Sequence, residues 1–156
     1  MRELRGKPVA DALTQQLKTR IEKLAENGIT PTLAIVRVGE RADDLSYERG
    51  AQKRFAGAGA DVQVHTLRAD CSQADLENTL TRLSRDPAVD GILLFRPLPA
   101  QLSETRAKSF IDPAKDVDCF TDGGYAALLT GSGKACPPCT PAAVMELLDH
   151  YGIDLT

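Results

Sequence analysis

TLAIVRV, residues 32–38, is a nearly continuous apolar run that is bounded by Pro31 and Gly39. Successive side chains of a strand point to opposite faces, so an unbroken apolar run needs a covering layer on each face. We therefore predict that residues 32–38 form a strand that is buried on both faces of a sheet.

Strand-like and helix-like segments alternate along the rest of the chain. DVQVHTL (61–67) alternates in polarity and GILLF (91–95) is continuously apolar, so both are predicted strands. Residues 112–138 are expected to be irregular, except for an apolar turn at YAALL (125–129). The alternation indicates an α/β fold with three αβα layers, a mainly parallel sheet and right-handed crossovers. Helices are predicted over residues 9–27, 44–57, 72–85, 103–110 and 140–151.

Two of these helices begin with recognisable capping residues. Ser72 and Asp75 have the spacing of a capping box, in which each side chain accepts from the backbone of the other residue. Thr140 is an expected N-cap because Pro141 follows it, and proline is favoured at the first helical position.

Length and composition indicate an ordinary globular domain. The 156 residues are enough to bury a core, and 42% hydrophobic and 26% charged residues are typical proportions. A net charge of −3 and scattered basic residues argue against a nucleic-acid partner. No apolar run approaches the ~20 residues of a membrane span, and the N-terminus lacks the apolar core of a secretory signal. We therefore expect a cytoplasmic protein.

Cys136-Pro-Pro-Cys139 has the spacing of a redox dithiol. The preceding residues, GSGKA, lack the apolar strand that normally leads into such a motif, so an ordinary entry into a helix is the favoured interpretation. His65 and His150 show no ligand spacing relative to the cysteines, and we expect no metal site.

The ligand of a parallel α/β sheet binds beyond the carboxyl ends of the strands. Three loops meet this description, at residues 39–45, 68–71 and 96–100. Neither G-x-G-x-x-G nor G-x-x-x-x-G-K-[ST] is present, so no phosphate-binding loop is predicted within the chain.

Four stretches together resemble one enzyme family. They are VGERADDLSYERGAQKR (38–54), VDGILLFRPLP (89–99), DPAKDVDCF (112–120) and PPCTPAAVMELLDHYGIDL (137–155). In this order and spacing they are similar to the N-terminal domain of the bifunctional methylenetetrahydrofolate dehydrogenase/cyclohydrolase family, FolD. The resemblance covers nearly all of residues 1–156. It implies a folate-binding catalytic domain, to which a C-terminal Rossmann domain, absent from this chain, would be joined.

The resemblance also implies an activity and partners. Members of the family oxidise 5,10-methylene-tetrahydrofolate by hydride transfer to NADP, and then hydrolyse the methenyl product to 10-formyl-tetrahydrofolate. The reduced folate binds between the two domains, and a homodimer forms mainly through the C-terminal domain. NADP is therefore expected only with that missing domain.

Four positions correspond to the folate site of the family. Tyr47 matches the tyrosine that stacks on the substrate, and Asp118 matches the aspartate that holds the amino edge of the pterin. Ala51 stands where the family has its catalytic lysine, in a YxxxK motif. Phe95 stands where the family has the glutamine that pairs with this lysine, in a QLPLP motif.

Other candidate residues come from the same stretches. Pro97, Leu98 and Pro99 match the end of the QLPLP motif, and the resemblance implies that they contact the substrate. Charged residues that could form a substitute polar lining are Arg54, Arg96, Asp43 and Asp44.

No residue near Tyr47 replaces the missing lysine. At about 100° per residue, the position stacked over Tyr47 is i+4, which is Ala51. Lys53 points about 120° away. Arg54 returns to the face of Tyr47, but a guanidinium does not deprotonate. Since a lysine beside the cationic methenyl ligand would suit proton transfer, the cyclohydrolase activity is expected to be impaired.

Three functions are compatible with these observations. The first is a divergent FolD-type catalytic domain, cut from a longer native chain, that keeps its dehydrogenase chemistry. The second is a non-catalytic folate- or pterin-binding module. The third is a pocket that has been repurposed for another small molecule, with the four charged residues as its polar lining.

Overall fold

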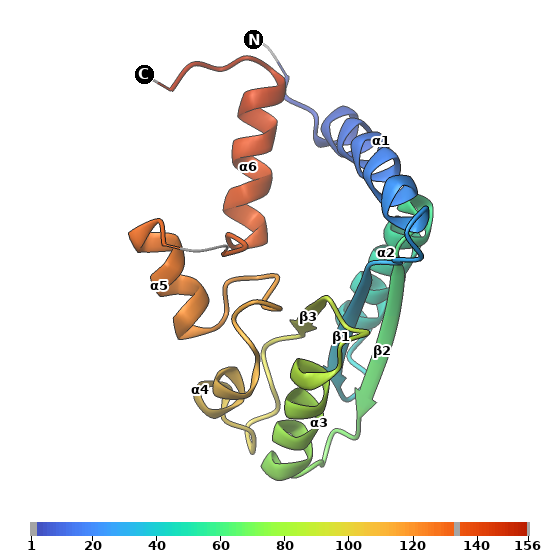
Figure 1. Ribbon diagram of the computed structural model, residues 1–156. Helices are drawn as coiled ribbons and strands as arrows, with labels where there is room; N and C mark the ends of the chain where they lie inside the picture. Colours follow the sequence, from blue (N-terminus) through green and yellow to red (C-terminus); the bar gives the residue numbers. More distant parts are fainter. Residues whose placement is uncertain (1–2, 133–134, 156) are drawn as a thin grey trace.

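A computed structural model describes residues 3–132 and 135–155 of the protein (Figure 1). The α/β alternation predicted from the sequence is confirmed. Among the described residues, no helix is long and apolar enough to cross a membrane. The elements in chain order are α1 (Gly6–Ala25), β1 (Thr32–Val38), α2 (Ala42–Ala58), β2 (Asp61–Leu67), α3 (Gln73–Arg85), β3 (Gly91–Leu94), α4 (Glu104–Ala107), the 3-10 helix η1 (Lys108–Phe110), α5 (Asp122–Thr130) and α6 (Cys139–His150).

The three strands form one parallel sheet in the order β2–β1–β3. β1 is central, and it pairs with β2 from Thr32 opposite Asp61 to Val38 opposite Leu67. All seven residues of β1 are buried, which confirms the prediction of a strand covered on both faces. β2 is an edge strand that is only partly buried, in agreement with its alternating polarity.

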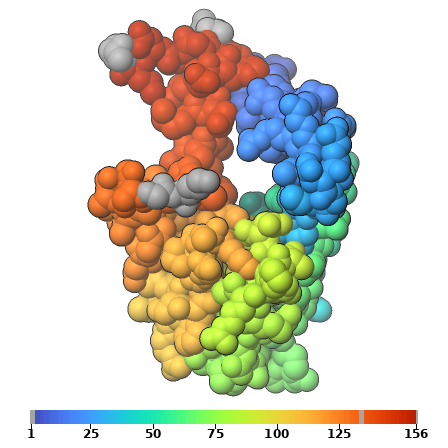
Figure 2. Space-filling view, in the orientation of Figure 1, coloured from blue at the N-terminus to red at the C-terminus, as the bar shows by residue number. Residues whose placement is uncertain are grey.

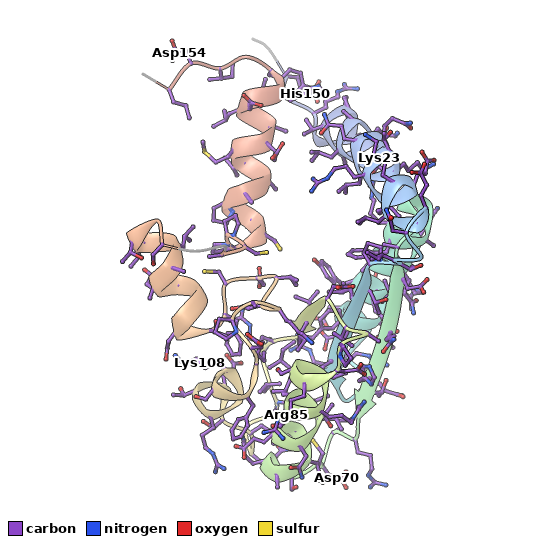
Figure 3. All side chains as sticks on the ribbon, viewed as in Figure 1. Lys23, Asp70, Arg85, Lys108, His150 and Asp154 are labelled. Atoms are coloured by element: carbon purple, nitrogen blue, oxygen red, sulfur yellow. The ribbon has the colours of Figure 1, made fainter. Side chains whose placement is uncertain are left out.

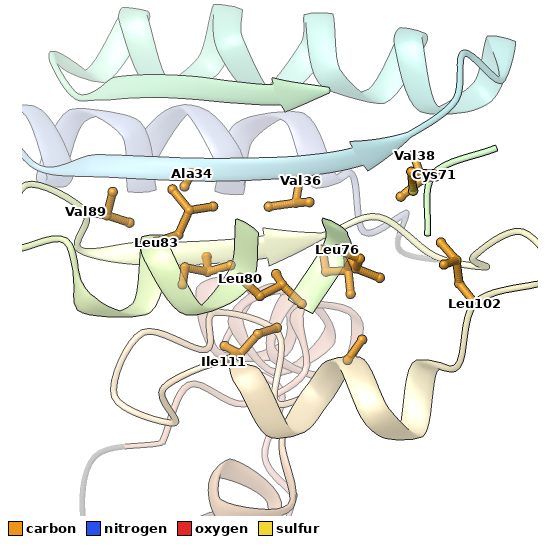
Figure 4. Packing of buried hydrophobic residues seen from close by; sticks show 13 residues of the cluster. Ala34, Val36, Val38, Cys71, Leu76, Leu80, Leu83, Val89, Leu102 and Ile111 are labelled. Atoms are coloured by element: carbon orange, nitrogen blue, oxygen red, sulfur yellow. The ribbon is translucent and has the colours of Figure 1, made fainter. Parts of the chain in front are cut away.

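One face of the sheet packs against α3 (Figure 4). Leu76, Leu80 and Leu83 of α3 are fully buried against the apolar side chains of β1 and β3. They recur at i, i+4 and i+7, so one stripe of the helix supplies the core of this layer. Ser72 and Asp75 form the predicted capping box at the start of α3.

The opposite face of the sheet packs against α2, and α1 lies against α2 (Figure 1). Leu33 and Ile35 of β1 form a second apolar cluster with Phe95, which follows β3. Ala51 and Phe55 of α2 pack against this cluster. The second layer is therefore held by apolar contacts between α2, the central strand and the end of β3.

An ion pair is buried beneath α2. Arg37 of β1 is 5% exposed, and its Nε donates to Glu48 Oε2 at 2.8 Å. The same guanidinium donates to the Gly39 carbonyl and to the Thr66 hydroxyl. A buried charge is tolerated when it is paired and hydrogen-bonded. The pair therefore fixes the position of α2 on the sheet.

The segment expected to be irregular contains a nine-residue helix, α5, so this prediction was wrong. Thr121 caps α5, because its Oγ1 accepts from the Gly124 N–H at 3.0 Å. Gly124 lies so close to Asp116 that a Cβ would meet Asp116 Oδ2 at 3.0 Å. Two glycines in the first turn, Gly123 and Gly124, lower the helix propensity and hide the helix in the sequence.

The start of α6 also differs from the prediction, since Thr140 is not its N-cap. Pro138 occupies the cap position and makes no side-chain capping hydrogen bond. The Cys139 N–H is instead satisfied by Asp118 Oδ1 at 3.0 Å. An acceptor from a distant loop therefore replaces a local cap.

The C-terminal end of α6 is tied to the start of the described chain. The Tyr151 hydroxyl donates to the Arg5 carbonyl at 3.0 Å and accepts from the Arg5 N–H at 3.1 Å. Figure 2 shows an open hollow between α6, in red, and α1, in blue. The two helices therefore approach at one end and leave the space between them open.

Candidate functional site

Two adjoining cavities lie along β3, at an edge of the sheet. Their volumes are about 330 and 350 Å³, and we refer to them together as the β3 cavity. Tyr47, Leu93 and Cys139 line both parts. Residues that complete the first part are Asp43, Asp44, Leu94, Phe95, Arg96 and Asp118. Residues that complete the second, more apolar part are Pro31, Thr32, Leu33, Ala51, Phe55, Asp90, Gly91 and Val117.

Two of the three loops expected at the site reach the β3 cavity. Residues 39–45 and 96–100 each supply part of its lining. Residues 68–71 line other cavities, beyond the end of β2. The reason is the strand order, because β2 and β3 lie at opposite edges of the sheet.

The KDVD segment extends the sheet beside β3. The Ile92 N–H donates to the Lys115 carbonyl at 2.7 Å, and Ile92 pairs with Asp116 in a parallel bridge. Asp116 is 4% exposed and accepts from the backbone N–H groups of Asp118 at 3.2 Å and Thr121 at 2.7 Å. It therefore shapes the loop that presents Asp118. This role was not predicted; the Asp-Val-Asp spacing would place both carboxylates on the same face of an extended segment, and it does not signal which of the two is buried.

Asp118 lies where three parts of the chain meet. Its Oδ1 accepts from the Cys139 N–H at 3.0 Å, and its Oδ2 accepts from Arg96 Nη2 at 3.2 Å. Cys119 has a φ of 54°, in the left-handed region that non-glycine residues rarely adopt. Phe120 follows this turn, and its ring centroid lies 4.4 Å from the guanidinium carbon of Arg96. The turn therefore brings both a carboxylate and an aromatic ring to Arg96.

Tyr47, Ala51 and Phe95 lie on the same side of the cavity. The ring centroids of Tyr47 and Phe95 are 5.5 Å apart with an interplanar angle of 79°, an edge-to-face contact. Phe95 is 8% exposed, and Ala51 packs against the same apolar cluster. Tyr47 is 61% exposed, so much of its ring is accessible to a ligand. Where the resemblance implies a lysine and a glutamine, the cavity wall is therefore hydrocarbon.

Two acidic groups in the cavity hold their protons near neutral pH. Partial desolvation at the cavity wall, with Cys139 and Asp118 nearby, raises the pKa of the Tyr47 phenol. Cys139 is exposed overall, but partial desolvation of its thiol and the neighbouring Asp118 raise the pKa of the thiol to about 11. The Cys139 Sγ lies 3.5 Å from the Val117 carbonyl. Neither group is therefore an effective base at pH 7.

The surroundings of Cys136 and Cys139 do not favour dithiol chemistry. Both thiols are free, and reactive dithiols need a cysteine whose pKa is lowered rather than raised. Within residues 3–132 and 135–155, no group of three or more His, Cys, Asp or Glu side chains is arranged to hold a metal ion.

Three of the four charged residues considered as a substitute lining reach the cavity. Asp43, Asp44 and Arg96 line it. Arg54 instead donates to Thr14 Oγ1 of α1 at 3.1 Å and lines a separate cavity between α1 and α2. The i+7 position lies about 10 Å along the axis from Tyr47, far enough for Arg54 to reach α1 instead.

Pro97, Leu98 and Pro99 follow Arg96, but none of these three described residues lines the β3 cavity. The Leu98 N–H donates to Glu104 Oε1 at 3.1 Å, and its side chain packs on the core beside α3. This segment therefore leads the chain away from the cavity and into α4.

The strand-to-helix turns do not fit a dinucleotide. A pyrophosphate binds at a helix N-terminus that directly follows a strand. α2 begins with Asp43 and Asp44, whose negative charges repel phosphate. The start of α3 is occupied by its own capping box. Neither of these two helix starts therefore suits a pyrophosphate.

Comparisons of the sequence with known proteins point to one family. Residues 4–118 match the family described as tetrahydrofolate dehydrogenase/cyclohydrolase, catalytic domain. The bifunctional protein FolD of Clostridioides difficile (strain 630) is 47% identical over 152 residues, and that of Carboxydothermus hydrogenoformans is 43% identical over 152 residues. Each match covers 97% of this chain and 53% of the relative.

Solved structures lead to the same family. FolD from Campylobacter jejuni has a TM-score of 0.93 at 32% identity, over 97% of this chain and 54% of that one. FolD from Trypanosoma brucei, in complex with NADP cofactor and inhibitor, has a TM-score of 0.90 at 31% identity, over 99% and 54%. The chain spans about half the length of these relatives. It belongs to the tetrahydrofolate dehydrogenase/cyclohydrolase family, whose catalytic domain it contains.

Proposed function

We propose that this chain is the folate-binding domain of a methylenetetrahydrofolate dehydrogenase whose cyclohydrolase step is impaired. The observation that carries the proposal is that Ala51 and Phe95 belong to one apolar cluster beside the cavity. In the family that the chain resembles, these two positions are occupied by the catalytic lysine and by the glutamine that pairs with it. Tyr47 and Asp118, which match the substrate-binding residues of the family, line the same cavity.

The cavity suits a pterin ring, which is flat and has N–H groups along one edge. The accessible ring of Tyr47 can stack on it, a contact worth about 0.5–1.5 kcal/mol beyond area burial. Each oxygen of Asp118 accepts one hydrogen bond within the described chain and retains a lone pair for a ligand N–H. The ring would therefore lie on Tyr47 with its amino edge toward Asp118.

Oxidation of the methylene carbon leaves a positive charge on the folate. Asp43 and Asp44 share one partner, Arg41, so this wall of the cavity keeps a net negative charge that favours the cation. The contribution of this chain to oxidation is to position the substrate. The hydride acceptor, NADP by resemblance, would bind a C-terminal domain that we propose follows in a longer native chain.

Hydrolysis of the methenyl group requires a base for the attacking water. Tyr47 and Cys139 keep their protons near pH 7, because their pKa values are raised. The Asp118 carboxylate already accepts from Arg96 and from a backbone N–H. A positioned acid or base typically contributes about 10²–10⁴-fold to a rate, so the absence of the lysine should slow hydrolysis by that factor.

Mixing the chain with 5,10-methenyl-tetrahydrofolate tests this proposal. Calorimetry measures binding, and the absorbance of the methenyl group measures hydrolysis. We expect the ligand to bind and to be hydrolysed no faster than in buffer. Hydrolysis about 100-fold above the buffer rate would show that another group in the cavity acts as the base.

The proposal also includes the homodimer, the cytoplasmic location and the reduced-folate substrate that the sequence and the resemblance imply. A second candidate function is a pocket that serves another small molecule. It is favoured by the 3.2 Å contact of Arg96 with Asp118, which occupies part of the carboxylate. In that case the same titration would detect no binding of reduced folates.

A further inference from the structure

Arg96 is fixed at the rim of the cavity from two sides. Its Nη2 donates to Asp118 Oδ2 at 3.2 Å. Its guanidinium carbon lies 4.4 Å from the ring centroid of Phe120, a cation–π contact. Because stacking and pairing already restrict this side chain, it loses little conformational freedom when it contacts a ligand.

Arg96 and Asp118 both retain unused hydrogen-bonding groups. A guanidinium has several N–H groups, of which one is donated to Asp118 within the described chain. The side chains remain partly accessible, at 38% for Arg96 and 29% for Asp118, and both line the cavity. This wall therefore presents hydrogen-bond donors directly beside acceptors.

Resting on the proposed function, we infer that Arg96 determines which ring edge the site accepts. A carboxylate beside a guanidinium complements an edge with two N–H donors next to a carbonyl acceptor. A 2-amino-4-oxo pyrimidine ring has this edge, with its amino group and ring N–H on Asp118 and its carbonyl on Arg96. A 2,4-diamino ring places a second amino group against the guanidinium, so that two donors face each other.

Arg96 is a feature of this chain that the family resemblance does not supply. The matching position of the QLPLP motif is leucine, which has no hydrogen-bond donor. A leucine there would leave the carbonyl of the ring without this partner. The discrimination between the two ring types should therefore be stronger in this chain than in a variant that carries leucine.

The test is a calorimetric comparison of two ligands, a stable reduced 2-amino-4-oxo folate analogue and its 2,4-diamino counterpart. A hydrogen bond to a charged group is worth about 1.5–3 kcal/mol, so the chain should prefer the oxo ligand by about 10–100-fold. Arg96→Leu should lower the ratio of the two affinities to what the ring N–H on Asp118 contributes alone, and Arg96→Lys should retain more of the preference than Arg96→Leu. Arg68→Leu is the matched control, because Arg68 is exposed and pairs with Asp70 beyond β2.

The outcomes separate this inference from the proposed function. A preference that falls in Arg96→Leu and is unchanged in Arg68→Leu supports the role of Arg96. Binding of both ligands with the same ratio in Arg96→Leu as in the unaltered chain would overturn it and leave the proposed function standing. If neither ligand bound, the proposed function and the inference would both fall.

Discussion

Ala51→Lys combined with Phe95→Gln should create methenyl hydrolysis in the β3 cavity. The introduced lysine would stand over Tyr47 on α2, at a half-buried position beside Phe55 and Val117. Desolvation there lowers the pKa of an ammonium group, which suits proton transfer near neutrality. We expect the double variant to hydrolyse the methenyl ligand about 10²–10⁴-fold faster than the unaltered chain.

The same double variant should also have a lower free energy of unfolding, mainly because it loses the buried ring of Phe95. Burial of a phenylalanine contributes about 1.5–3 kcal/mol, and the edge-to-face contact with Tyr47 adds about 0.5–1.5 kcal/mol. Phe95 is 8% exposed, so Phe95→Gln should cost about 2–4.5 kcal/mol in the free energy of unfolding. Ala51→Lys should add little, because both residues favour helices and a lysine stem can lie along apolar surface.

The assay measures the decay of methenyl absorbance and, separately, unfolding in urea. Ala51→Met with Phe95→Gln is the matched control, because it supplies a long side chain without an amino group. A folded double variant that binds the ligand and hydrolyses it no faster than this control would refute the reasoning. It would mean that the loss of the lysine is not what limits hydrolysis in this cavity.

Three further predictions concern stability. Glu48→Ala leaves Arg37 buried and unpaired, so urea denaturation should show a loss of about 3–5 kcal/mol; a loss below about 1 kcal/mol would argue that the pair is not buried in solution. Gly91→Ala places a Cβ 2.6 Å from Val117 Cγ1, so it should cost about 1–3 kcal/mol, and an unchanged Tm would contradict the packing. The raised pKa of Cys139 means that the folded chain binds the thiol proton more tightly than the unfolded chain. The contribution of Cys139 to the free energy of unfolding should therefore be fully present below the ordinary thiol pKa of 9.0 and be lost as the pH rises toward about 11. Cys139→Ala should make the decrease smaller in pH-dependent unfolding curves, and an unchanged decrease would contradict the raised pKa.

Features that depend on neighbouring residues could be predicted from the sequence. β1 was identified by its continuous apolar run, because burial on both faces requires such a run. The start of α3 was identified because Ser72 and Asp75 satisfy each other across one turn. Both signals lie entirely within the element that they specify.

Features that depend on distant residues could not be predicted in this way. Thr140 was expected to cap α6, but the free N–H group of Cys139 is satisfied by Asp118 from another loop. Asp116 is likewise placed by a distant contact, because it pairs with Ile92 at the edge of the sheet. Arg54 shares a helical face with Tyr47, yet it contacts α1 because α1 packs against α2.

The resemblance predicted part of the lining of the β3 cavity, but Pro97, Leu98, Pro99 and Arg54 lie outside it, and its geometry was not predictable. Tyr47, Ala51, Phe95 and Asp118 were chosen by resemblance, and the structure places all four around the β3 cavity. The contact of Arg96 with Asp118 depends on the left-handed turn that follows Asp118, which no local pattern signals.

Calorimetric titration of the chain with a stable reduced-folate analogue, beside Asp118→Asn, is the most direct test of a folate site in the β3 cavity. We expect the unaltered chain to bind and Asp118→Asn to bind about 10–100-fold more weakly, because an amide is a poorer partner for ligand N–H groups and for Arg96. Asp70→Asn is the control, because Asp70 follows β2 at the other edge of the sheet (Figure 3). Equal binding by the unaltered chain and Asp118→Asn, or binding by neither, would contradict the assignment of this cavity to a folate.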